Sequence, residues 1–139
     1  MDIDWDKIHK LIPEKILLFF HIATFEVSYP RAPGDFAIKI LQQPNKQYLG
    51  LPNYDYWGPD QATPYKSVNP EDSIEDALAS AISGITLFDK ADFPNDCIFW
   101  VKYRGFEPIL VMDGNGSEVT WRDANNRRDK YHQEKNTVV

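Results

Sequence analysis

Residues 73–85 read Ser-Ile-Glu-Asp-Ala-Leu-Ala-Ser-Ala-Ile-Ser-Gly-Ile, and no other part of the chain predicts its own structure so clearly. Apolar residues recur here at intervals of three and four positions, which is the spacing of one face of an α-helix. Ser73 belongs to the residue types that cap helix N-termini, and Glu75 and Asp76 suit the positive end of the helix dipole. The pattern predicts an amphipathic helix over about residues 73–86 that buries its apolar face against another layer.

Strand patterns lie on both sides of this helix. Residues 36–51 contain two apolar runs around a Pro-Asn turn, and residues 97–121 contain three such runs, the last two joined by Asp-Gly-Asn-Gly. Residues 24–29 alternate with period two and form a further candidate strand. The sequence therefore predicts one α+β domain over residues 1–139, with an antiparallel sheet made of two hairpins plus one further strand.

The N-terminal region predicts two short helices that pack on this sheet together with the 73–86 helix. Asp4 is a candidate N-cap for the first helix, and Pro13 ends it and opens the second. The second helix gives way to strand near His21. We expect the core to contain residues from every element: Ile8, Leu17, Phe20, Val27, Ile38, Ile40, Leu78, Ile82, Phe99, Val101, Leu110 and Val119.

Residues 52–70 show no periodicity and are rich in proline and aromatic residues, so they are expected to form a long loop. Two interpretations of its rings stay open: they pack back on the sheet, or some face outward and anchor a partner. The second interpretation makes these rings candidate binding residues: Tyr54, Tyr56, Trp57 and Tyr65.

The acidic residues are concentrated next to this loop. The chain carries 21 acids and 15 bases, a formal charge of −6, and residues 71–96 alone hold seven acids and one base. A solvated helix face would explain this cluster, and so would recognition of a partner protein with a basic surface. The candidate binding acids stand at the start of the predicted helix: Glu71, Asp72, Glu75 and Asp76.

Several functional classes find no support in the sequence. The net negative charge disfavours binding to nucleic acid phosphates, and no apolar run is long enough to cross a membrane. The three histidines are far apart and Cys97 is the single cysteine, so we expect no metal, no cofactor and no catalytic residue with a recognisable motif. The acidic N-terminus lacks the pattern of a secretory signal, and the lone thiol fits a reducing compartment, so we expect a cytoplasmic protein.

The remaining evidence favours a non-enzymatic acidic protein-binding module. In size, charge and lack of catalytic motifs the chain is similar to small acidic inhibitors, such as toxin-immunity proteins and phage-encoded inhibitors of host defence. One alternative is a small enzyme with a site around the aromatic loop at residues 54–66. A weaker alternative is a nucleic-acid contact through the polar C-terminal segment, residues 123–139, which contains Arg127, Arg128 and Lys130.

Overall fold

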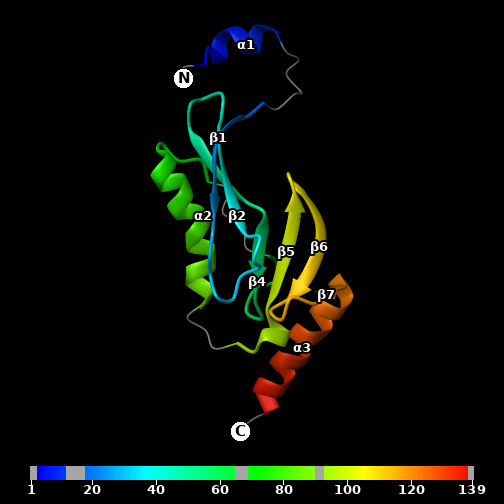
Figure 1. Ribbon diagram of the computed structural model, residues 1–139. Coiled ribbons are helices and arrows are strands. Elements are labelled where there is room, and N and C mark those ends of the chain that lie inside the picture. Colours follow the sequence, from blue (N-terminus) through cyan, green and yellow to red (C-terminus); the bar gives the residue numbers. More distant parts are fainter. Residues whose placement is uncertain (1–2, 12–17, 65–68, 90–92, 138–139) are drawn as a thin grey trace.

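Two antiparallel sheets stand side by side in the computed structural model, which describes residues 3–11, 18–64, 69–89 and 93–137 (Figure 1). The first sheet has the strand order β1-β2-β3 and the second β4-β5-β6-β7. The strands of the first sheet are β1 (Phe20–Glu26), β2 (Ala37–Gln42) and β3 (Tyr48–Pro52). Those of the second are β4 (Tyr54–Trp57), β5 (Phe99–Arg104), β6 (Glu107–Asp113) and β7 (Glu118–Val119).

Three α-helices complete the single α+β domain: α1 (Trp5–Leu11), α2 (Ile74–Asp89) and α3 (Trp121–Thr137), with a short 3-10 turn, η1 (Asn95–Cys97), before β5. Each α-helix begins at a side chain that accepts a backbone N–H: Asp4 from Lys7, Ser73 from Asp76 and Thr120 from Asp123, all at 3.0 Å. The helix predicted at residues 73–86 and its Ser73 cap are thus confirmed. Figure 1 shows α2 along the first sheet, α3 at the end of the second, and α1 at the opposite end of the molecule. No helix within the described ranges is long and apolar enough to span a bilayer.

The helix α2 lies on β3 and β2 because its small residues permit a close approach. A Cβ atom added to Gly50 on β3 would lie 2.5 Å from the carbonyl oxygen of Ala77 and 3.0 Å from the Cβ of Ala81. Both alanines are buried, at 1% and 4% exposure. Glycine facing alanine therefore sets the distance between this helix and the sheet.

The larger of two apolar cores fills the space between α2 and the facing sides of the two sheets. It contains Ile38 and Ile40 from β2, Ala77 and Ala81 from α2, and rings from the second sheet. The Trp100 ring of β5 packs edge to face on two other rings. Its centroid lies 5.2 Å from that of Tyr56 on β4 and 5.8 Å from that of Phe36, which directly precedes β2. This core joins the two sheets into one unit.

A second core lies on the other side of the second sheet, beneath α3. It is formed by Trp57, Phe99, Val101, Val111 and Ala124. The part of the second sheet formed by β4 and the first half of β5 is consequently buried on both faces, and these segments show no alternation between buried and exposed residues.

The architecture corrects four sequence-based expectations. The strands form two sheets, because β4 continues from β3 but pairs with β5 instead of joining the first sheet. Residues 54–57, expected within a loop, form β4. The strand expected at residues 24–29 begins earlier, because β1 starts at Phe20, close to the predicted end of the second N-terminal helix, and it ends earlier, at Glu26 instead of Tyr29. Residues 12–17, where that helix was expected to begin, lie outside the described residues.

Parallel substitutions at two glycines test the packing of α2. Gly50→Ala should destabilise the protein by about 1 to 3 kcal/mol, because the new methyl group meets the backbone of α2. Gly34→Ala is the matched control, since an added Cβ there meets nothing within 4 Å. Its stability should stay within about 1 kcal/mol of wild type or rise slightly. Urea unfolding measures both, and equal stabilities of the two variants would contradict the close approach.

Candidate functional site

The three described aromatic residues of the predicted binding loop are buried in β4. Tyr54, Tyr56 and Trp57 expose 2%, 6% and 2% of their surfaces, so the prediction that these rings face outward as anchors is wrong. The physical reason is pairing: β4 aligns with β5 from Tyr54 opposite Lys102 to Trp57 opposite Phe99. Its side chains therefore enter the two cores. Tyr65, the fourth predicted ring, lies outside the described residues.

Arg128 of α3 packs against the C-terminal end of β4. Its guanidinium group lies 4.5 Å from the centre of the Trp57 ring and donates hydrogen bonds to the carbonyl oxygens of Gly58, at 3.2 Å, and Gln61. Burial lowers the pKa of Arg128. His132, one helical turn further on, lies 2.5 Å from the carbonyl oxygen of Pro59. These contacts explain why the polar C-terminal segment forms an ordered helix.

Burial and ion pairing make much of the positive charge of this segment unavailable to a nucleic acid. Arg128 is buried, and Arg127 forms ion pairs with Asp113 and Asp123 at 2.9 Å each. Lys130 remains exposed, 4.0 Å from Glu134. Since phosphate binding depends on accessible basic side chains, no specific observation favours the nucleic-acid alternative.

The four predicted binding acids, Glu71, Asp72, Glu75 and Asp76, do come together at the start of α2, and we call them the acidic α2 surface. Asp72, Glu75 and Asp76 are exposed, whereas Glu71 is half-buried. Glu71 pairs through its backbone with Tyr48 at the start of β3 and accepts a hydrogen bond from Ser80 at 2.8 Å. Asp72 accepts one from Gln47 at 3.1 Å. The β2–β3 hairpin thereby holds Glu71 and Asp72 in position.

Apolar residues lie beside the acidic α2 surface. On α2, Ser80 faces Glu71 at the outer edge of β3, so helical geometry places Leu78 and Ile82 on the opposite flank of the buried alanines. Both are half-buried. Within the first sheet the helix lies mainly on β3 and then on β2, and Phe25 on β1 remains 37% exposed.

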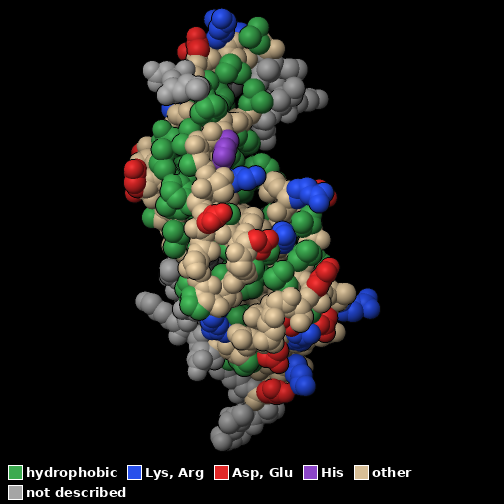
Figure 2. Space-filling model, viewed as in Figure 1, with side chains coloured by type: hydrophobic (Ala, Val, Ile, Leu, Met, Phe, Trp, Pro, Cys, Tyr) green, Lys and Arg blue, Asp and Glu red, His purple; other side chains and the backbone are tan. Residues whose placement is uncertain are grey.

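We call Phe25, Leu78 and Ile82, with the half-buried Ile22 of β1, the α2–β1 strip. Figure 2 shows hydrophobic side chains gathered over α2 and the neighbouring strand, with acidic side chains at the outer side of α2. The sequence predicted the helix residues of this strip as core. The partial exposure of Phe25 on β1 depends on tertiary packing, which no local sequence pattern encodes.

Three buried or partly buried titratable groups, Tyr54, Tyr103 and Cys97, have raised pKa values. Burial and then hydrogen bonding to Asp35 raise the pKa of Tyr54, and burial and then Asp55 raise the pKa of Tyr103. Burial, followed by the charge of Asp96, raises the pKa of Cys97 to about 11. These shifts move the groups away from the range in which a catalytic acid or base operates. In the described part of the chain no three His, Cys, Asp or Glu residues form a metal-binding group.

Comparison with known proteins gives no relative. No protein-family model, no curated protein and no solved structure matches this chain.

Replacing the Arg128 side chain tests whether it holds the segment after β4 against α3. Arg128→Met should lower the free energy of unfolding by about 2 to 4 kcal/mol, because the Gly58 and Gln61 carbonyls lose their charged donor in a buried place. Arg122→Met, at an exposed position of the same helix, should change it by less than about 0.5 kcal/mol. Chemical unfolding followed by tryptophan fluorescence measures both. A similar small effect at the two positions would contradict the assignment.

The reactivity of Cys97 tests the prediction that it is a structural thiol. With a pKa of about 11, only about one thiol in a thousand is ionised at pH 8, and the side chain is 9% exposed. Alkylation by iodoacetamide, followed by mass spectrometry, should therefore be much slower in buffer than in concentrated urea. Equal rates under the two conditions would show that the thiol is accessible and activated in the folded protein.

Proposed function

We propose that this protein is a non-enzymatic binding module that recognises a partner protein with a basic surface. The observation that carries the proposal is the juxtaposition of the acidic α2 surface with the partly exposed α2–β1 strip. Exposed carboxylates attract a basic partner over a distance, and apolar side chains beside them provide area to bury on contact. The buried rings of β4 support this surface from within.

Such a module acts by covering its partner, as small acidic inhibitors and immunity proteins do. We place the complex in the cytoplasm, where a single reduced cysteine is the norm. The enzyme alternative centred on residues 54–66 has no comparable observation in its favour, because residues 54–59 are buried and Gln61 is held by hydrogen bonds with Trp57 and Gly58.

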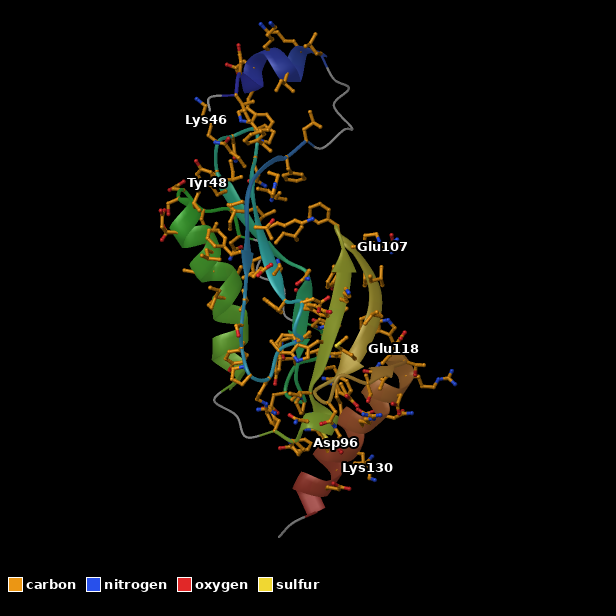
Figure 3. The ribbon with its side chains drawn as sticks, viewed as in Figure 1. Lys46, Tyr48, Asp96, Glu107, Glu118 and Lys130 are labelled. Atoms are coloured by element: carbon orange, nitrogen blue, oxygen red, sulfur yellow. The ribbon has the colours of Figure 1, made fainter. Side chains whose placement is uncertain are left out.

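Affinity capture from the source organism tests the proposal when wild type is compared with surface variants. The first variant, Glu75→Gln with Asp76→Asn, removes two exposed charges, and the second, Phe25→Ser, removes the exposed ring of the strip. The matched control is Glu107→Gln with Glu118→Gln, because these exposed acids lie on the second sheet, away from α2 (Figure 3). The partner should be captured by wild type and by the control, and less by both test variants.

The captured partner then permits kinetic measurements that separate the two parts of the surface. Neutralising Glu75 and Asp76 should slow association and weaken its dependence on salt, whereas Phe25→Ser should speed dissociation. Stopped-flow binding at two salt concentrations measures both rates. Rates that equal those of the Glu107→Gln, Glu118→Gln control in both variants would refute the proposed surface.

A further inference from the structure

The loop between β1 and β2 faces the turn between β6 and β7 across a pocket of about 240 Å³. Residues 30–34 line it from the loop and residues 113–116 from the turn, with Trp100 and Met112 contributing from the strands. The two linings come from different sheets. The indole N–H of Trp100 donates to the carbonyl oxygen of Arg31 at 3.1 Å and holds the loop beside the second sheet.

Arg31, which lines this pocket, has a positive charge that no described carboxylate pairs with. Its Nη2 atom donates to the carbonyl oxygen of Phe93, at 2.6 Å, and to the side-chain oxygen of Asn95, at 3.2 Å. Both acceptors are neutral, and no carboxylate of the described residues forms an ion pair with Arg31. Its Nε and Nη1 atoms make no hydrogen bond within the same described ranges, so three of the five N–H donors of the guanidinium group remain.

Two acids beside the pocket, Asp113 and Asp35, are paired with other cations. Both carboxylate oxygens of Asp113 are used: one accepts the backbone N–H groups of Asn115 and Ser117, and the other pairs with Arg127 at 2.9 Å. Asp35, next to the loop residue Gly34, pairs with Lys102 at 3.1 Å. Of the two charged residues that line the pocket, Asp113 is thus paired with Arg127, whereas Arg31 has no ion pair among the described residues.

The size and the lining of the pocket restrict the ligand. A volume of about 240 Å³ is below the 300–1,000 Å³ that drug-sized ligands occupy, so the pocket fits one charged group with a short apolar body. The planar fork of arginine matches a carboxylate, and the exposed Asn115 lines the same pocket with its amide. Met112 and the prolines of the loop line the pocket and give apolar surface for the body.

We propose that this pocket binds a carboxylate that carries a small apolar group, with Arg31 as the recognising residue. A free small carboxylic acid and the C-terminus of a peptide share this chemistry. The pocket and the acidic α2 surface are built from different residues, so failure of either proposal leaves the other intact.

Titration of the ¹⁵N-labelled full chain, followed by two-dimensional NMR, tests the pocket. The probes are benzoate and its neutral analogue benzamide, and a tetrapeptide ending in leucine with a free or an amidated C-terminus. We expect saturable shifts of the amides in residues 31–34 and 114–117 with benzoate, with the free-acid peptide, or with both. Which carboxylate binds identifies the source. Benzamide and the amidated peptide should bind at least tenfold more weakly.

Arg31→Gln should weaken carboxylate binding at least tenfold, while Arg104→Gln, at an exposed arginine on β5, should leave it unchanged. Because Arg31 also ties the loop to Phe93, the comparison of each acid with its amide tests the charge requirement on the unmodified protein. Three results would overturn the proposal: absence of saturable shifts at the pocket with either carboxylate, equal affinities for an acid and its amide, or carboxylate binding that survives in folded Arg31→Gln.

Discussion

Burial of β4 on both of its faces is the constraint on which the rest of this structure depends. Tyr54 and Tyr56 enter the core shared with the first sheet, and Trp57 enters the core beneath α3. One strand of four residues thereby connects two sheets and two helices. Polar groups near it form hydrogen bonds locally. The indole N–H of Trp57 donates to the carbonyl oxygen of Gln61, and Arg128 donates to the carbonyl oxygens of Gly58 and Gln61. Loss of this strand would separate the α2 half of the molecule from the α3 half.

This constraint decides which side chains are free to function. Aromatic rings that hold two sheets together cannot also anchor a partner, so recognition has to use residues that packing leaves exposed. We propose that this role belongs to the acids at the start of α2, to the partly exposed α2–β1 strip and to the half-buried Arg31 between the two sheets. The buried rings and the tied hairpins keep these groups in place, which limits the entropy lost on binding.

Local patterns were sufficient to predict part of this structure. The α2 stripe, its Ser73 cap, the two hairpins and the burial of Ile38, Ile40, Phe99 and Val101 follow from spacing and turn chemistry alone. The sequence could not show that Tyr54–Trp57 is a strand, because a strand buried on both faces has no alternation and prolines flank it closely. The acidic α2 surface was predictable from composition. The α2–β1 strip and the Arg31 pocket were not, since both are formed by elements that meet only in the folded chain.

Native-state hydrogen exchange on β4 tests the central claim most directly. If β4 connects the two sheets, its amides paired with β5 exchange only through global unfolding, with the same free energy as the central amides of β5. Increasing concentrations of denaturant should then lower the protection of both strands in parallel. Exchange of the β4 amides through a local opening would contradict this account. The free energy of that opening would lie well below that of global unfolding and would not depend on denaturant, as expected if residues 54–57 behaved as a surface loop.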